Sequence, residues 1–260
     1  MGAALQMIDT RAIVHRLKTL ESVAVIARVT STNLIARRIL DECLDNDLSL
    51  PQAIIIAGEQ FAGRGRNERA WSSPPGKGIY ATTLLTRPAP ELPLFPLEMA
   101  NAVATYLRET FGIDARIKWP NDVLVDGRKI AGILIEARVQ ETNVHMIIGT
   151  GINLEPVESD ERPNATSVSE VARHGYVGID AAVTAFIEHL DGRFGTATDR
   201  KMVLDEWRRM TIHKSGDRIS SVFGSRTVSG TWDGIDEHGR ALIRTESETL
   251  AVSAGDVIVQ

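Results

Sequence analysis

Apolar residues recur at intervals of three and four along several stretches of the chain. This spacing places them on one face of a helix and therefore predicts amphipathic helices. The helix expected at residues 97–111, for example, carries Val103, Tyr106 and Leu107 on one face. Predicted helices cover residues 8–20, 34–44, 97–111 and 180–194, and a further helical segment ends near Met210.

Shorter runs of β-branched and apolar residues lie between these helices. Such runs, bounded by turn-forming residues, predict strands, and Asp126-Gly127 is a typical two-residue hairpin turn. Four prolines between residues 88 and 96 predict an irregular connection, and the acidic residues 155–164 predict a mobile loop. Predicted strands cover residues 23–29, 52–58, 78–86, 115–118, 122–125, 129–139 and 144–149.

The pattern changes after Lys214, where strands become short and follow one another through Gly-rich and polar turns. Such a series predicts a small antiparallel β-barrel. We therefore expect an α/β (α+β) domain at residues 1–212 and a small β domain at residues 213–260. The predicted strands of the second domain cover residues 218–222, 227–232, 241–244 and 257–260.

Composition narrows the possible functions. With 43% hydrophobic residues and a net charge of −5, the 260-residue chain can build a core and gives no bulk electrostatic argument for nucleic-acid binding. The single cysteine, Cys43, favours a reducing cytoplasm, and we expect it to be buried. We find no signal-peptide pattern, no membrane-spanning stretch and no histidine spacing typical of a metal site.

A glycine–arginine loop at residues 63–71 carries the first candidate chemistry. Gly63 and Gly65 allow backbone turns that other residues resist, while Arg64, Arg66 and Arg69 bring three permanent positive charges together. Such a loop could enclose a phosphate or carboxylate. Taken alone, however, it is more often a solvated basic turn, and an arginine–glycine nucleic-acid-binding segment is a further alternative.

Two lysine-containing motifs follow. In K-W-P-N-D, Pro120 restricts the backbone and fixes Lys118, Asn121 and Asp122 in a turn between strands. In K-I-A-G-I-L-I-E, Lys129 begins an apolar strand in which Gly132 would allow close approach of a ligand or another backbone segment. The alternatives are a solvated hairpin loop and a lysine at the sheet edge whose ammonium reaches water.

Two polar motifs complete the set. Residues 31–33 read S-T-N before a predicted helix, so helix capping is the default interpretation and hydrogen bonding to a ligand ring is the alternative. Residues 149–153 read G-T-G-I-N at a strand end. The two glycines predict a tight turn, and Asn153 could bind a base edge.

Together these motifs resemble the biotin protein ligase family. S-T-N, E-Q-x-A-G-R-G-R-x-x-R-x-W, K-W-P-N-D, K-x-A-G-I-L-x-E and G-x-G-I-N occur in the family's order and spacing, and A-T-S at residues 165–167 matches a further element. The resemblance is strong over residues 25 to 170. It implies that residues 1–212 form a mixed-sheet catalytic domain similar to that of class II aminoacyl-tRNA synthetases and that residues 213–260 form an SH3-like β-barrel. It also implies ATP-dependent attachment of biotin to a lysine of a carrier protein.

The resemblance also implies roles for individual residues. Biotin contacts carry over to Ser31, Thr32, Asn33, Gln60, Gly63, Arg64, Gly65, Arg66, Lys129 and Gly132. Nucleotide contacts carry over to Arg66, Arg69, Trp71, Lys118, Asn121 and Asn153. We expect Arg64, Lys118, Asp122 and Lys129 to act in catalysis, with Lys129 on the biotin carboxylate.

The implied substrates are ATP and biotin, with Mg²⁺ arriving on ATP. The implied partner is the biotin carboxyl carrier domain of an acyl-CoA carboxylase, and the protein would be a monomer or weak homodimer. Only 30 residues precede S-T-N, so we expect no three-helix DNA-binding unit. Two alternatives stay open: a lipoate or octanoate ligase or transferase of related fold, and a non-catalytic biotin-responsive regulator.

Overall fold

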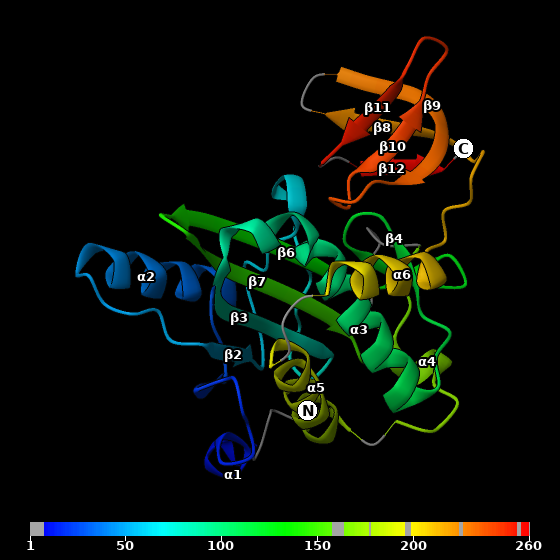
Figure 1. Ribbon diagram of the computed structural model, residues 1–260. Coiled ribbons are helices and arrows are strands. Elements are labelled where there is room, and N and C mark those ends of the chain that lie inside the picture. Colours follow the sequence, from blue (N-terminus) through cyan, green and yellow to red (C-terminus); the bar gives the residue numbers. More distant parts are fainter. Residues whose placement is uncertain are drawn as a thin grey trace.

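The computed structural model of the chain contains two β-sheets and several helices (Figure 1). It describes residues 8–157, 164–176, 178–195, 199–223, 226–253 and 256–259. Most of the predicted mobile loop at residues 155–164 lies outside these described residues, and so does Gln260 at the end of the last predicted strand.

The larger sheet has seven strands in the order β1-β2-β3-β7-β6-β5-β4. Strands β1 and β2 are parallel and the other neighbours are antiparallel, so the sheet is mixed, as expected. The strands are β1 (Ser22–Ile26), β2 (Ala53–Ala57), β3 (Gly78–Pro88), β4 (Arg116–Lys118), β5 (Asp122–Val125), β6 (Arg128–Gln140) and β7 (Asn143–Asn153).

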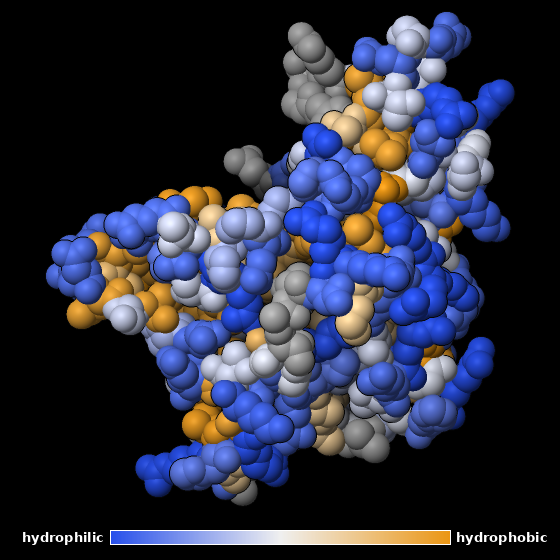
Figure 2. Space-filling model, in the orientation of Figure 1, coloured by the Kyte–Doolittle hydropathy of each residue, from blue (hydrophilic) through white to orange (hydrophobic). Residues whose placement is uncertain are grey.

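Helices cover both faces of this sheet. In β2, Ile54 and Ile56 belong to the large core on one face, whereas Ile55 belongs to a smaller cluster on the other. This alternation follows from the two-residue period of a strand. Helix α2 (Thr32–Asp45) covers the face of Ile55, and Cys43 is buried within it. On the face shown in Figure 2, hydrophobic residues gather over the α2 region at the left.

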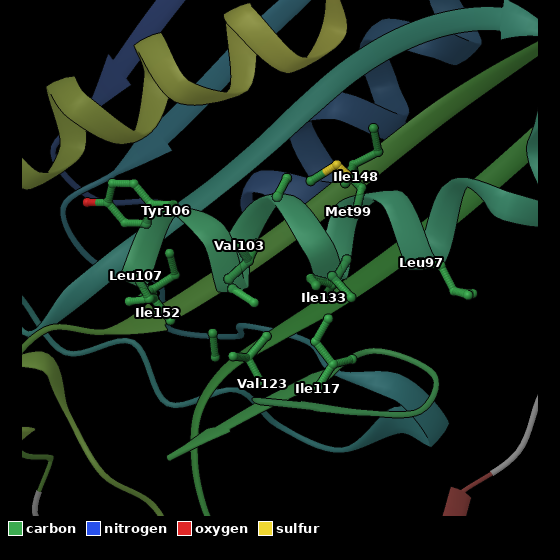
Figure 3. Packing of buried hydrophobic residues seen from close by; sticks show 14 of the residues in the cluster. Leu97, Met99, Val103, Tyr106, Leu107, Ile117, Val123, Ile133, Ile148 and Ile152 are labelled. Atoms are coloured by element: carbon green, nitrogen blue, oxygen red, sulfur yellow. The ribbon is translucent and has the colours of Figure 1, made fainter. Parts of the chain in front are cut away.

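Helix α3 (Phe95–Phe111) forms the centre of the larger core. Met99, Val103 and Leu107 lie over strand residues such as Ile133 and Ile148 (Figure 3), and all five are buried. Helices α5 (Ile179–Phe194) and α6 (Arg200–Met210) pack against α3. No helix in the part of the chain that is described is both long and apolar enough to cross a membrane.

The first predicted helix is much shorter than expected. It spans only α1 (Thr10–Val14), not residues 8–20. The reason lies 170 residues away, where the buried carboxylate of Asp191 accepts hydrogen bonds from the amides of Lys18, Thr19 and Leu20, each at 2.8 Å. These amides are therefore bonded to a side chain instead of to helix carbonyls.

The proline-rich connection is also more regular than predicted. Residues Ala89–Leu94 form a 3-10 helix (η2), and Pro96 lies in the first turn of α3. Proline is tolerated in a first helical turn because its missing N–H would have no helical acceptor there. The short helix α4 (Val168–Val171) and strand β11 (Thr249–Val252) were not predicted.

The second sheet is antiparallel, with the order β11-β10-β9-β8-β12. The predicted boundary at residue 213 falls between α6 and the first of these strands. Apart from β11, the strands are β8 (Arg218–Phe223), β9 (Arg226–Ile235), β10 (Ala241–Arg244) and β12 (Asp256–Val259). We refer to these five strands as the C-terminal sheet.

Candidate active site

A pocket of about 490 Å³ lies where the beginning of α2, the glycine–arginine loop, the turn between β4 and β5, and strands β6 and β7 meet. It brings together all but one of the residues that the sequence analysis assigns to substrates. The predicted residues that line it are Ser31, Thr32, Asn33, Gln60, Arg64, Gly65, Arg66, Arg69, Trp71, Lys118, Asn121, Asp122, Lys129, Gly132 and Asn153. Gly63 is the exception.

Three glycines of the sheet form what we call the glycine floor: Gly132 on β6, and Gly149 and Gly151 on β7. A Cβ at Gly151 would lie 2.3 Å from the Trp71 indole, and a Cβ at Gly149 would lie 2.4 Å from the Asn33 amide oxygen. Gly132 pairs with Gly151 and would also meet Trp71, at 3.0 Å. A ligand or another backbone segment was expected close to Gly132, whereas the structure places the Trp71 side chain there. The tight turn predicted at residues 149–153 is wrong, because β7 continues to Asn153.

Thr32 and Asn33 form a hydrogen-bonded network with Gln60 and Thr82, which we call the S-T-N network, and the motif does not cap α2. Ser31 occupies the N-cap position but makes no side-chain cap bond. The amide of Thr32 donates to the Gln60 side-chain oxygen at 2.8 Å, and Thr82 donates to the Asn33 amide oxygen at 2.6 Å. Thr82, on β3, was missed because a single threonine in a buried strand has no distinguishing sequence signal.

The glycine–arginine loop is a tight hairpin. The amide of Trp71 donates to Gly63 at 2.9 Å, and the amide of Gly65 donates to Arg69 at 2.7 Å. The left-handed residue is Asn67, with φ 53°, whereas Gly65 has an ordinary φ of −113°. Gly63 is needed for space, since a Cβ there would lie 2.4 Å from the Trp71 carbonyl oxygen. Gly63 therefore serves close packing, and neither Gly63 nor Gly65 has a positive φ.

One hydrogen-bonded chain connects this loop to the main sheet. Arg66 donates to the Asn121 side-chain oxygen at 2.8 Å, and the Asn121 amide nitrogen donates to the carbonyl oxygen of Ile133 at 2.7 Å. Asn121 itself lies in the K-W-P-N-D turn, which contains a cis Trp119-Pro120 bond and connects β4 to β5. The predicted turn between strands is confirmed.

Lys129 is held by its side chain and by its backbone. Its ammonium pairs with the Asp122 carboxylate at 2.6 Å and lies 5.4 Å from the centre of a Trp71 ring. Its amide donates to the Asn164 carbonyl at 2.7 Å, while its own carbonyl accepts from Thr166 at 2.9 Å. A short parallel bridge to Ala165 completes this arrangement, which fixes the point from which the side chain enters the pocket.

The segment that holds Lys129 also holds Asn153. The Asn153 side chain donates to the Thr166 carbonyl at 3.0 Å, and Asn164 and Ala165 line the pocket themselves. A-T-S at residues 165–167 matches a family element, but no contact was predicted for these residues. This match was the sequence signal that could have identified them as part of the pocket wall.

The lining is strongly cationic. Among the described lining residues, the cationic ones are Arg64, Arg66, Arg69, Lys118 and Lys129, against the single carboxylate of Asp122. Such an excess of positive charge attracts anions and offsets repulsion between them. Within the described ranges, no group of three or more His, Cys, Asp or Glu side chains could hold a metal ion. The excess of positive charge in the described lining therefore suits the pocket to anionic ligands.

Comparisons with known proteins agree with this chemistry. Residues 25–153 match the Biotin/lipoate A/B protein ligase family, and residues 215–259 match the Biotin protein ligase C terminal domain. The fold is similar to that of a solved structure, "Biotin protein ligase from Aquifex aeolicus in complex with biotin and ATP", with a TM-score of 0.71 and 24% identity. The similarity covers 92% of this chain and 98% of that one.

Two curated relatives are similar over most of the chain. The "Biotin--[acetyl-CoA-carboxylase] ligase" of Paracoccus denitrificans is 34% identical over 222 residues, which cover 79% of this chain and 89% of the relative. The "Bifunctional ligase/repressor BirA" of Bacillus spizizenii is 31% identical over 235 residues, 82% of this chain and 68% of the relative. The five motifs, the fold and these matches agree: the chain belongs to the biotin protein ligase family.

Proposed function

We propose that the chain activates biotin with ATP to give biotinyl-5′-AMP and then transfers biotin to a lysine of a biotin carboxyl carrier protein. The observation that carries this proposal is the pocket lined by five cationic side chains and one carboxylate. Biotin and ATP are both anions, so a site that joins them must offset their repulsion. The printed names of the relatives support a ligase of this kind.

In the first step, a biotin carboxylate oxygen attacks the α-phosphorus of ATP. The new P–O bond forms as the bond to the β-phosphate oxygen breaks, and pyrophosphate leaves with that electron pair. Neither bond involves a protein nucleophile. The chain's contribution is to position the reactants and to stabilise the charge on the phosphoryl oxygens, for which Arg64, Lys118 and Lys129 are the proposed residues.

In the second step, the amine of the acceptor lysine attacks the carbonyl carbon of the mixed anhydride. The amide bond forms, the C–O bond to AMP breaks, and the amine loses a proton. We assign Lys129 to the biotin carboxylate and later to the carbonyl oxygen. The Asp122 carboxylate holds the Lys129 ammonium at 2.6 Å, so its proposed role is orientation of that lysine and of the incoming amine.

The two substrates would occupy different parts of the pocket. We propose that biotin lies between the S-T-N network and the glycine floor, where Thr32, Asn33 and Gln60 present polar groups. The nucleotide would lie toward Arg69, Trp71, Lys118, Asn121 and Asn153. Arg64, Gly65 and Arg66 border both parts, and Gly63 acts indirectly by allowing the loop to close on Trp71.

Mg²⁺ would enter with ATP. Oxygen ligands are what this ion prefers, and the phosphates with water supply them. Within the described part of the pocket lining, Asp122 is the only acidic side chain, and it is already paired with Lys129. We therefore expect the ion to be coordinated mainly by substrate and water.

We propose a biotin carboxyl carrier domain of an acyl-CoA carboxylase as the acceptor, a cytoplasmic location, and a monomer or weak homodimer without DNA binding. The curated relatives include enzymes named for acetyl-CoA carboxylase and a bifunctional ligase/repressor. Binding to DNA in a gel-shift assay would contradict the proposed absence of DNA binding.

One assay tests the function: biotin-dependent exchange of pyrophosphate into ATP, followed by transfer of labelled biotin to a carrier-domain lysine. We expect exchange with biotin and transfer to the carrier domain. Activity with lipoate or octanoate in place of biotin would favour the related acyl ligases. Biotin binding without exchange would favour a non-catalytic regulator.

A further inference from the structure

The K-W-P-N-D turn has a second side that faces away from the pocket. Lys118, Asn121 and Asp122 line the pocket, whereas Trp119 is only 2% exposed and is directed toward the C-terminal sheet. Its indole N–H donates to the carbonyl oxygen of Gly239 at 3.1 Å. Gly239 lies in the turn between β9 and β10. The turn that carries two proposed ATP contacts is therefore bonded directly to the second sheet.

His213 makes the other contact between these parts. It lies between α6 and β8 and is 6% exposed. Its Nε2 atom accepts a hydrogen bond from the backbone amide of Trp119 at 3.0 Å. Its ring stacks on Trp232 of β9, with ring centroids 4.4 Å apart and planes inclined by 20°. One side chain thus joins the backbone of the turn to the core of the C-terminal sheet.

The chain on either side of His213 strengthens this connection. The amide of Ile212 donates to Ile117 at 2.9 Å, and Thr211 forms a parallel bridge with Ile117. Residues 211–213 therefore run beside β4 as far as Lys118. Since β4 lies at the edge of the seven-stranded sheet, this segment and the C-terminal sheet support the turn on its outer side.

We propose that His213 is a positioning residue for the ATP-binding turn. By accepting the Trp119 amide hydrogen, it fixes the backbone between Lys118 and Asn121 and links their placement to the C-terminal sheet. This inference rests on the proposed function, because it takes these two side chains as contacts of ATP.

The backbone amide of Trp119 requires a hydrogen-bond acceptor at the position of the His213 Nε2 atom. Because Nε2 accepts, the proton of the neutral ring resides on Nδ1, for which no partner is found in the described part of the chain. Without an acceptor, the buried Trp119 amide would lack a partner, which is unfavourable. The turn would relax toward another acceptor and would displace Lys118 and Asn121 from the pocket.

Two substitutions distinguish the role of the His213 hydrogen-bond acceptor from the role of its aromatic ring. H213F keeps an aromatic ring for Trp232 but removes the acceptor, whereas H213Q can place its amide oxygen near the position of Nε2 and removes the stack. H189F is a matched control, since His189 is another largely buried histidine, on α5, that contacts Tyr106 and does not line the pocket. Thermal melting verifies that each variant is folded.

Biotin-dependent pyrophosphate exchange then gives KM for ATP, KM for biotin and kcat. We expect H213F to raise KM for ATP by about tenfold or more and to leave KM for biotin unchanged. H213Q should restore KM for ATP toward the wild-type value, and H189F should not change it. If H213F does not fold, H213N replaces it, because its shorter side chain brings the amide oxygen short of the Trp119 amide.

The outcomes separate the two proposals. A wild-type protein without biotin-dependent exchange contradicts the proposed function itself. An active wild type, together with the same KM for ATP in H213Q and in the folded variant without an acceptor, overturns the positioning role of His213. Equal increases in the KM values for ATP and biotin would overturn it as well, because they would indicate general damage to the pocket.

Discussion

Lys129 is the side chain that we assign to both proposed reaction steps, and the structure holds it in a defined place. Its backbone is bonded on both sides to residues 164–166, and its ammonium lies between the Asp122 carboxylate and the Trp71 ring. The charge is thus held in place before a substrate arrives. A preorganised charge of this kind stabilises a transition state without reorganisation during the reaction.

Replacing Lys129 with glutamine should reduce pyrophosphate exchange by about a hundredfold or more, since one preorganised charged donor is lost. The side chain is partly exposed, so the fold should persist. K77Q is a suitable control, because Lys77 is exposed and does not line the pocket. Exchange by K129Q at the wild-type rate, measured with saturating biotin and ATP, would contradict the assignment.

Gly151 permits a separate prediction about the glycine floor. G151A places a methyl group 2.3 Å from the present position of the Trp71 indole, so Trp71 must move and ATP binding should weaken. G192A is the matched control, because a Cβ at Gly192, in helix α5, would meet nothing within 4 Å. Alanine there should stabilise the protein by up to about 1 kcal/mol. Unchanged ATP affinity of G151A by calorimetry would refute this role of the floor.

The glycine–arginine loop acts as one element because its hydrogen bonds connect it both to itself and to the sheet. It closes as a hairpin between Gly63 and Trp71, and Arg66 extends from it to Asn121. The loop is therefore joined to the K-W-P-N-D turn by a side-chain hydrogen bond. Closure over the adenylate would protect the anhydride from water.

Substituting Arg66 with glycine should remove this bond and increase the rate at which biotinyl-adenylate leaves the protein. We expect R66K to release adenylate at an intermediate rate, because it retains a charge but not the planar guanidinium. Chromatographic separation of free from bound adenylate measures the difference. Release from R66G at the wild-type rate would show that the loop does not retain the intermediate.

Limited proteolysis tests closure of the same loop. Cleavage between Arg64 and Arg69 should slow when biotin and ATP are both present, since the loop would then be held over the adenylate. Cleavage near Lys214, outside the pocket, serves as the internal reference. Equal protection of both sites, or of neither, would argue against closure.

At the level of elements, the sequence predicted what depends on local pattern. The mixed sheet, helix α3 and the hairpin at Asp126-Gly127 agree with the structure; both turn residues have positive φ, at 49° and 76°, as this hairpin type requires. The motifs also identified nearly all of the pocket lining. Thr82 and the shortening of α1 by Asp191 could not be predicted, because both depend on contacts between distant segments.

At the scale of the whole molecule, the two sheets are in contact behind the K-W-P-N-D turn, which carries proposed nucleotide contacts. Trp119, His213 and Trp232 form this contact, and Arg200 of α6 adds a hydrogen bond to the Glu237 carbonyl at 2.6 Å. The stability of the contact therefore depends on His213, which must remain neutral in order to accept the hydrogen bond from the Trp119 amide.

This dependence predicts an effect of pH on stability. Burial, followed by the positive charge of Lys118, lowers the pKa of His213 from 6.5 to about 4, and Asp217 opposes this weakly. Because the folded pKa lies below the unfolded value, the associated stability is complete above pH 6.5 and is lost as the pH falls toward 4. Between pH 7 and about pH 4.5, wild type should lose about 2 to 3 kcal/mol more than H213F.

Urea unfolding at both pH values measures this difference. Other titrating groups are common to the two proteins, so they cancel in the comparison. Parallel loss of stability in wild type and H213F would show that His213 is not the group responsible.

The glycine floor also limits the paths by which this protein can change. Gly132 and Gly151 carry the smallest side chains available, and both lie against Trp71. Enlarging Gly151 while the indole is present creates a clash, because a Cβ there would lie 2.3 Å from Trp71, whereas the distance at Gly132 would be 3.0 Å. Shrinking the indole first creates room that a larger residue can then fill. Substitutions at Gly151 are therefore ordered in time, because Trp71 must change or move before this glycine can be replaced.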